Sequence, residues 1–175
     1  EARLQAFLGG IGLGTSLLYD FTPPDIEPFS PQNPLIFTSA PLVGTGLTTT
    51  AKYAVVTKSP LTGFIADSLS SSFFALELKR TGLDAIVVTG RAAQPIYLWI
   101  TDNTVEFRDA GRLWGKSPQE AEGAIRAALQ DSEIRIAAIG QAGENRVRFA
   151  TLSNEGRHAG RGGIGAVFGS KNLKA

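Results

Sequence analysis

Six of the chain's 20 glycines lie between residues 156 and 169, and this cluster constrains the fold more than any other feature. Glycine inside a helix or strand costs about 0.5–1 kcal/mol relative to alanine, so regular secondary structure does not explain the cluster. Backbone amides flanked by Arg157 and Arg161, together with the N-terminus of a following helix, can cradle a phosphate or another anion. Alternatively, the glycines allow a helix to pack tightly against a sheet.

The glycine cluster does not have the context of a nucleotide-binding motif. Residues 160–165 match the pattern GxGxxG, but residues 154–157 separate them from the preceding apolar run. The acidic residue that binds ribose, expected about 20 positions later, falls beyond residue 175. The glycine spacing in residues 165–171 also differs from that of a Walker loop.

The composition excludes several chemistries. A chain of 175 residues with 43% hydrophobic and 19% charged residues is expected to form one globular domain, residues 1–175. It has no cysteine, so it supplies no thiolate nucleophile, disulfide, zinc finger or cluster ligand. His158 is its single histidine, which excludes a two-histidine metal site within the chain. His158 can act as a general base or bond within a loop, and the lack of a visible partner favours the loop.

The formal net charge of +1 predicts no general attraction to nucleic acid or to a membrane. The charge is nevertheless uneven, because residues 144–175 hold six Lys/Arg and two Asp/Glu. The apolar stretch from Leu4 to Tyr19 lacks the features of a secretory signal and is shorter than the roughly 20 residues that span a bilayer. We therefore expect a cytoplasmic protein without nucleic-acid or membrane partners.

Periodicity and turn signals predict mixed helices and strands. In the first half we expect one glycine-loosened helix over residues 2–20, strands at 35–37, 53–57 and 84–89, and a helix at 73–80 capped from the serine run 68–72. In the second half we expect a hairpin of 96–101 and 105–108 across Asp102-Asn103, a helix at 117–130, and strands at 134–139 and 146–153 joined by a turn at 140–145. Strands and helices do not alternate regularly, which predicts an α+β domain rather than a doubly wound parallel sheet.

Two further patterns concern organisation. Residues 52–90 and 147–175 share the order strand, turn, small-residue loop, short helix and basic residues, a weak internal repeat. Because the second copy stops where its final strand is due, we expect the chain to be part of a longer protein. Four aromatic side chains are expected to pack in the core or at its edge: Tyr97, Trp99, Phe107 and Trp114.

Several ordered strings resemble the N-terminal domain of the tungsten-containing aldehyde ferredoxin oxidoreductases. They cover nearly the whole chain and are found at residues 35–37, 55–65, 77–79, 84–88, 108–110, 113–116 and 143–145, and in the glycine segment through residues 170–175. The resemblance implies a β-rich domain of two similar halves, related by a pseudo-two-fold axis, that forms a base for a bis-pterin cofactor of tungsten or molybdenum.

The resemblance also implies which residues contact this cofactor. They are Lys52, Leu69, Ser70, Ser71, Arg157, His158, Gly160, Arg161 and Gly162. Backbone carbonyls of Leu69 and His158 are implied to hold a Mg²⁺ ion that bridges the pterin phosphates. Three positions depart from the family pattern: Lys52 replaces an arginine, Leu69 begins a run that is usually Asn-Ser-Gly-Gly, and His158 replaces an alanine.

For the intact protein, the implied reaction is oxidation of an aldehyde to its carboxylic acid, with electrons passing through a [4Fe-4S] cluster to ferredoxin. The cluster ligands and proton-transferring residues are implied to lie in later domains, so no catalytic residue is assigned here. Homodimers are also implied. The alternative hypothesis is a module without redox activity, either a degenerate domain or one that binds phosphate or a nucleotide.

Overall fold

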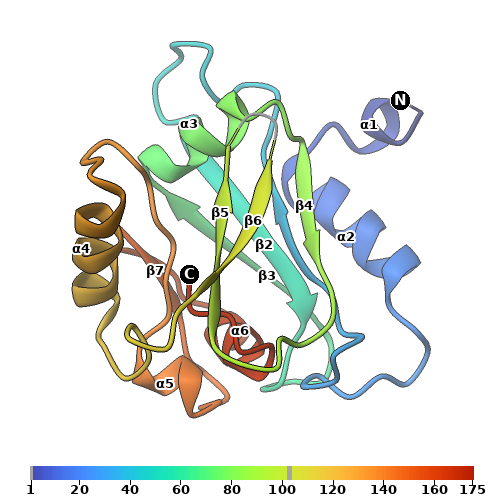
Figure 1. Cartoon of the computed structure of the whole chain (residues 1–175). Coiled ribbons are helices and arrows are strands. Elements are labelled where there is room, and N and C mark those ends of the chain that lie inside the picture. The colour runs from blue at the N-terminus through green and yellow to red at the C-terminus, as the bar shows by residue number, and fades with distance from the viewer. Residues whose placement is uncertain (1, 102–103) are drawn as a thin grey trace.

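The computed structural model describes residues 2–101 and 104–175, and its centre is a four-stranded antiparallel sheet with the order β3-β2-β1-β4 (Figure 1). The strands are β1 Leu35–Thr38, β2 Lys52–Lys58, β3 Ile65–Ser71 and β4 Ala85–Val88. The prediction of mixed helix and sheet without a doubly wound parallel sheet is confirmed. The predicted strands at 35–37, 53–57 and 84–89 are present. Strand β3 was not predicted.

The expected single helix over residues 2–20 is wrong, because the structure has two helices, α1 Ala2–Phe7 and α2 Gly10–Phe21. The break lies at Leu8 and Gly9, which both have positive φ angles of 58° and 139°. Helix α2 then crosses one face of the sheet. There Gly14 lets it approach closely, because a Cβ at this position would lie 2.6 Å from the Val56 side chain.

Two helices follow their capping signals. Helix α3, Phe73–Arg80, begins where the hydroxyl of Ser72 accepts the Phe74 amide at 3.1 Å, and it matches the predicted range. Helix α4, Pro118–Leu129, begins with a reciprocal capping box between Ser117 and Glu120. The Ser117 amide and hydroxyl both donate to the Glu120 carboxylate, and these bonds lower the pKa of that carboxyl.

The remaining elements belong to the second half of the chain. The predicted hairpin is formed by β5 Ile96–Ile100 and β6 Val105–Asp109, while Asp102-Asn103 lies outside the described residues. The other elements are α5 Gln141–Glu144, β7 Leu152–Asn154, β8 Arg157–Ala159 and α6 Ile164–Ser170.

Three predictions for this half are wrong. Residues 134–139 form no strand, because they make only an isolated bridge from Ala138 to Ser153. Residues 146–151 are likewise not a strand, since Arg146 adopts a positive φ of 56° and the chain turns there. The predicted turn at 140–145 contains the short helix α5.

The core lies on the face of the sheet opposite α2, where α3 and α6 pack. The ring of Tyr53 stacks on that of Phe37 and is tilted against that of Phe74, and Phe168 of α6 meets Phe37 edge-on. A second apolar cluster joins β5 to α4 through Tyr97, Ala121 and Ile125.

Of the four aromatic residues expected to pack, Tyr97 is buried, and Trp99 and Trp114 are half-buried. Phe107 is 72% exposed, which contradicts its expected packing. Across the two described ranges, no helix combines the length and apolarity required to cross a membrane.

Candidate functional site

The residues that the sequence proposed as cofactor contacts gather around strand β3 at the edge of the sheet. Lys52 is the cross-strand partner of Ser71, Tyr53 that of Ser70, and Ala54 that of Leu69. Since side chains alternate along a strand, Lys52, Leu69 and Ser71 share one face, and all three are exposed. Ser70 points to the opposite side and is buried. Its side chain is therefore the exception in this group.

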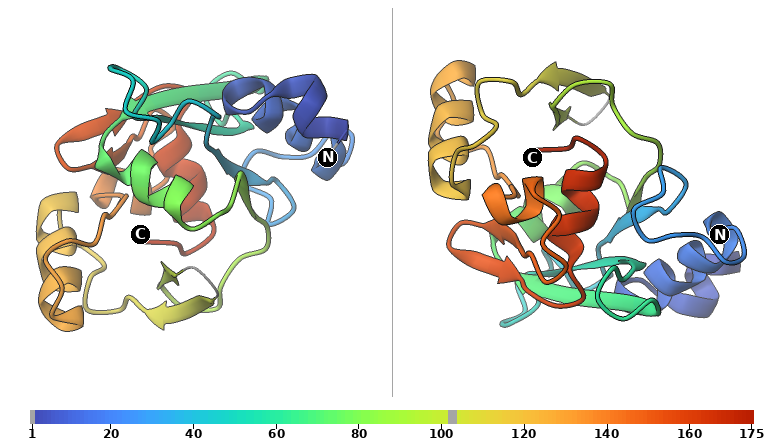
Figure 2. Two further views of the ribbon diagram at one scale, coloured as in Figure 1. Left: turned by 90° about the horizontal axis from the view of Figure 1, so that it is seen from above. Right: turned by 90° about the horizontal axis from the view of Figure 1, so that it is seen from below.

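The hairpin of β7 and β8 brings the second group of residues to the same edge. In Figure 2 it lies beside β3 in both views, and β8 contacts β3. Glu155 and Gly156 form its turn with positive φ angles of 50° and 73°, a combination that matches a type I′ turn. Arg157 pairs with Asn154 and His158 with Ser153 across the hairpin.

Side-chain hydrogen bonds, rather than strand pairing, join this hairpin and the glycine segment to the sheet. Ser70 Oγ donates to Asn154 Oδ1 at 2.9 Å, and the backbone amide of Arg161 donates to Ser68 Oγ at 3.0 Å. Ser59 Oγ donates to the carbonyl of Gly162 at 2.8 Å. We call the resulting surface of Lys52, Leu69, Ser71, Arg157, His158, Gly160 and Arg161 the β3 edge site.

Close packing explains four of the six clustered glycines. A Cβ at Gly162 would overlap Ala66, and one at Gly163, Gly165 or Gly169 would overlap a backbone carbonyl oxygen. Helix α6 is buried along its whole length, and the Gly165 amide at its start donates to the carbonyl of Ala150 at 3.0 Å. The tight-packing alternative therefore applies to these four positions.

Gly160 is different, because neither packing nor an unusual φ angle requires a glycine there. A Cβ at this position would meet the Thr151 methyl group at 3.8 Å and His158 Cβ at 4.0 Å, which are ordinary contacts. Gly160 is exposed and stands between His158 and Arg161. Bare backbone at an exposed position is what the close approach of a ligand requires.

The β3 edge site is cationic. Lys52, Arg157 and Arg161 are exposed, and none of them forms a salt bridge with any residue in the described parts of the chain. Asp67 is an exposed carboxylate on the same face of β3 as Leu69. His158 is held by Thr151, whose Oγ1 lies 3.3 Å from Nδ1, so its Nε2 is directed away from that contact.

Asn154 is the residue of this region that sequence reasoning missed. It is fully buried, and its Nδ2 donates to Tyr53 Oη at 2.9 Å and to Ser72 Oγ at 2.8 Å. With the bond from Ser70, its amide reaches β2, β3 and the N-terminus of α3. Burial raises the pKa of the Tyr53 phenol, so this hydroxyl stays protonated. The sequence offered only an Asn-Glu-Gly turn signal here.

Two charged residues, Glu122 and Arg135, contact the turn of the β7-β8 hairpin. Glu122 of α4 accepts the backbone amide of Glu155 at 3.3 Å, and burial raises the pKa of the Glu122 carboxyl. Arg135 bonds to Glu155 Oε1 at 2.8 Å, and its guanidinium lies 5.2 Å from the centre of the Phe73 ring. These contacts hold the turn residue Glu155 and involve neither Arg157 nor Arg161.

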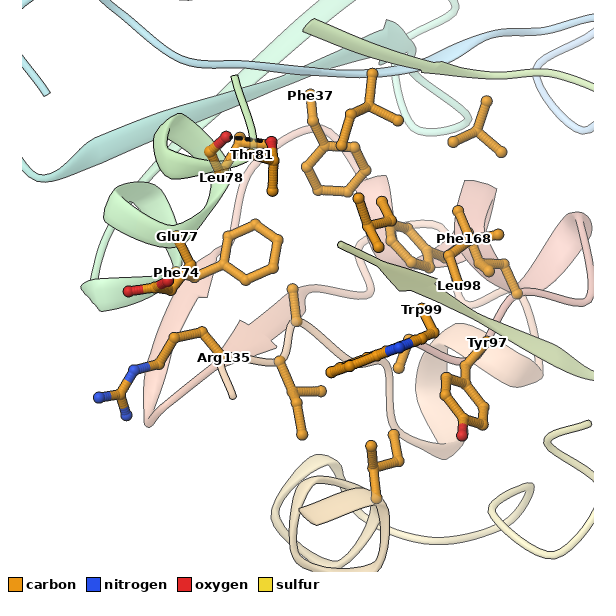
Figure 3. A pocket seen from close by; sticks show the side chains of 18 residues that line it. Phe37, Phe74, Glu77, Leu78, Thr81, Tyr97, Leu98, Trp99, Arg135 and Phe168 are labelled. Carbon is orange, nitrogen blue, oxygen red and sulfur yellow. Dashed lines mark hydrogen bonds between the residues drawn. The ribbon is translucent and has the colours of Figure 1, made fainter. Parts of the chain in front are cut away.

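A separate apolar cavity of about 130 Å³ lies between the core face of the sheet, α3, β5 and α4 (Figure 3). Rings of Phe37, Phe74, Phe168 and Trp99 line it, and the guanidinium of Arg135 points away from it. It contains none of the residues of the β3 edge site. In residues 2–101 and 104–175, no group of three or more histidine, aspartate or glutamate side chains is arranged to hold a metal ion.

Comparison with known proteins shows the family of the chain. The family described as "Aldehyde ferredoxin oxidoreductase, N-terminal domain" matches residues 1–175. The chain is 52% identical over its whole length to the tungsten-containing aldehyde ferredoxin oxidoreductase of Pyrococcus abyssi and 50% identical to that of Pyrococcus furiosus. It spans 29% of the length of each of these relatives. The chain belongs to the aldehyde ferredoxin oxidoreductase N-terminal domain family, as the sequence motifs indicated.

Two other relatives carry different names. An aliphatic sulfonate oxidoreductase, WOR-like subunit, from Pyrococcus furiosus is 39% identical over the whole chain, which covers 30% of that protein. Among solved structures, the active-site complex BamBC of benzoyl coenzyme A reductase, in complex with 1,5-dienoyl-CoA, matches with a TM-score of 0.96 and 43% identity. That match covers 99% of this chain and 26% of the other. The same domain fold is therefore found in proteins with differently named activities.

Proposed function

We propose that this domain is the base on which a bis-pterin cofactor of tungsten or molybdenum is held in a longer oxidoreductase. The observation that carries the proposal is the β3 edge site, which combines three exposed cations that form no salt bridge with a described residue and an exposed glycine that packing does not require. The names of the tungsten-containing relatives support the metal. The order strand, strand, helix at β2-β3-α3 recurs at β7-β8-α6 and supports two similar halves.

The residues present fit an anionic pterin cofactor. Arg157 and Arg161 can form charge-assisted, bidentate hydrogen bonds to phosphate, and Lys52 adds a point charge without the fork of an arginine. The exposed Gly160 allows a flat ring to approach the backbone. Leu69 and His158 lie on the contacting strands β3 and β8, so their carbonyl oxygens can contribute to a bridging Mg²⁺ ion, for which side-chain identity does not matter.

In the intact protein, we propose oxidation of an aldehyde to a carboxylic acid in the cytoplasm, with ferredoxin as electron acceptor. The bound cofactor would supply the redox chemistry, and a [4Fe-4S] cluster held by other domains would pass the electrons on. The residues of this chain would bind and orient the cofactor and neutralise its phosphates. The different names of the relatives fit a substrate pocket built mainly by the rest of the protein.

The first test is elemental analysis of the anaerobically purified full-length protein for tungsten, molybdenum and magnesium, with pterin detection after oxidative release. We expect one tungsten or molybdenum and about two pterins per chain. A protein without metal and pterin from cells supplied with both metals would contradict the proposal and favour the phosphate-binding or degenerate module.

The same analysis on Arg157→Ala tests the site. Loss of one charged hydrogen bond of about 1.5–3 kcal/mol predicts roughly ten- to hundredfold weaker cofactor binding. Arg112→Ala is the matched control, because Arg112 is also an exposed arginine without a salt bridge to any described residue, and it lies outside the β3 edge site. Equal cofactor content in both variants would show that Arg157 does not bind the cofactor.

A further inference from the structure

In the described residues, the hairpin that carries Arg157 and His158 has no strand partner in the main sheet, so strand pairing does not set its position against β3. Strands β7 and β8 form a separate two-stranded sheet, and the four-stranded sheet ends at β3. An isolated backbone bridge joins Ser153 of β7 to Ala138, which is not part of the main sheet. Yet the proposed site needs β8 at a fixed place beside β3, because its residues come from both strands. Some contact must therefore set the distance and angle between β3 and β8.

Asn154 makes the contact best suited to this task. It is completely buried, and its side-chain amide makes three hydrogen bonds, to Tyr53 on β2, Ser70 on β3 and Ser72 at the start of α3. Both of its amide hydrogens and its oxygen are thus used. An amide fixed at three points holds one orientation, and it ties the end of β7 to β2, β3 and α3 at once.

The position of Asn154 transmits this restraint directly to the site. Asn154 is the last residue of β7 and the cross-strand partner of Arg157, with only the two turn residues between them. His158 is the next residue along β8. On the other strand, Ser70 lies between the site residues Leu69 and Ser71. Asn154 therefore links the immediate neighbours of site residues on both strands.

We propose that Asn154 is a positioning residue for the cofactor: it fixes β8 against β3 and so sets the separation of the groups that hold the cofactor phosphates. This inference rests on the proposed function of the β3 edge site. It assigns to Asn154 no contact with the cofactor itself. Removing a residue that supports the ligands of a metal, without touching the metal itself, typically lowers metal affinity by about 10–100-fold.

The test compares Asn154→Leu with Asn33→Leu in the full-length protein. Asn33 is a matched control, since it too is completely buried and makes three hydrogen bonds, two to the carbonyls of Pro28 and Lys58 and one from the Lys58 amide. None of its partners belongs to the β3 edge site. We expect both variants to lower the unfolding temperature, but only Asn154→Leu to reduce tungsten and pterin per folded chain, by about tenfold or more.

Two further variants keep the test informative. Asn154→Asp keeps the shape and offers acceptors to the three hydroxyl groups, so we expect it to retain more cofactor than Asn154→Leu. If Asn154→Leu does not fold, Tyr53→Phe removes one hydrogen bond and keeps the ring packing. A reduced cofactor content in Tyr53→Phe then supports the proposal, and an unchanged content overturns it.

The outcomes separate this inference from the function on which it rests. A wild-type protein without tungsten, molybdenum and pterin contradicts the proposed function. A loaded wild-type protein whose Asn154→Leu variant is equally loaded contradicts only the role of Asn154. A loss in Asn33→Leu as large as in Asn154→Leu also overturns it, because the effect would then follow from general destabilisation.

Discussion

Residues 35–88 and residues 140–175 are held together in different ways. In the first region, strand pairing is continuous from β3 through β2 and β1 to β4. In the second, strands of three residues are fixed by glycine contacts and by hydrogen bonds of buried side chains. Strand pairing tolerates many side chains, whereas contacts of the second kind depend on particular atoms. We therefore expect the second region to be the more sensitive to single substitutions.

The largest expected difference concerns ion pairs. Lys174 and Glu144 form a buried salt bridge, with side chains 0% and 4% exposed, and Lys174 Nζ also donates to the Lys116 carbonyl at 2.8 Å. Lys174→Met leaves Glu144 buried without its partner, which we expect to lower the free energy of unfolding by about 3–5 kcal/mol.

The control is Arg80→Met in the first region, which removes the exposed pair of Arg80 with Glu77. Its expected cost is below about 1 kcal/mol. Denaturant unfolding of both variants measures the difference. Similar losses would show that the two regions do not differ in this respect.

The second comparison is between two glycines of the same segment, one closely packed and one exposed. Gly169→Ala would drive a methyl group into the Gly143 carbonyl oxygen in α5, and we expect a loss of about 3 kcal/mol. Gly160→Ala meets only ordinary contacts and should change stability by less than about 0.5 kcal/mol. Midpoints of denaturant unfolding check both values. A large loss in Gly160→Ala would mean that packing, rather than a ligand, explains that glycine.

The smallest expected effect comes from Lys171, whose buried ammonium donates to the carbonyls of Pro31 and Gly90 at 3.0 and 3.2 Å. Burial, with a smaller contribution from Arg91, lowers the pKa of Lys171 to about 8. The unfolded chain therefore binds more protons than the folded one between about pH 8 and the ordinary lysine pKa near 10.4.

Burial of the charged Lys171 ammonium therefore lowers the free energy of unfolding by its full amount below about pH 8. This loss is recovered as the pH rises above 8. We expect this recovery to amount to about 2 kcal/mol between pH 8 and pH 10. Subtracting the pH profile of Lys171→Met from that of the wild type isolates the contribution, and Lys79→Met serves as the control. If the free energy of unfolding of the wild type and of Lys171→Met changes in parallel between pH 8 and pH 10, Lys171 does not contribute to the pH dependence.

Local signals in the sequence explain why part of the fold was predictable. The capping residues Ser72 and Ser117 lie where α3 and α4 begin, and the apolar runs of β1 and β2 fill the core. Strand β3 escaped prediction because its inward side chains are polar. Ser68 and Ser70 are buried against Arg161 and Asn154, partners 93 and 84 residues away in the chain.

The site was predictable only in part, for the same reason. The resemblance placed Lys52, Leu69 and Arg157 in one site, and the structure brings them to one edge of the sheet. Four of the six clustered glycines instead serve packing, and the residues that they contact belong to other segments of the chain, which the glycine pattern does not identify. Asn154 has the sequence signature of a turn residue, and its role depends on Tyr53, which is 101 positions away.

The bonds between β3 and the hairpin also bear on the order in which the molecule assembles. Together with the bonds of the glycine segment to Ser59 and Ser68, they join residues 84 to 103 positions apart, while the pairing of β2 with β3 closes a short turn. Contacts distant in sequence form late, because closing a long loop costs entropy before any bond is gained. During synthesis, the sheet can form as soon as β4 has left the ribosome, but the site must wait for Gly162. We therefore expect cofactor insertion to follow the completion of this domain.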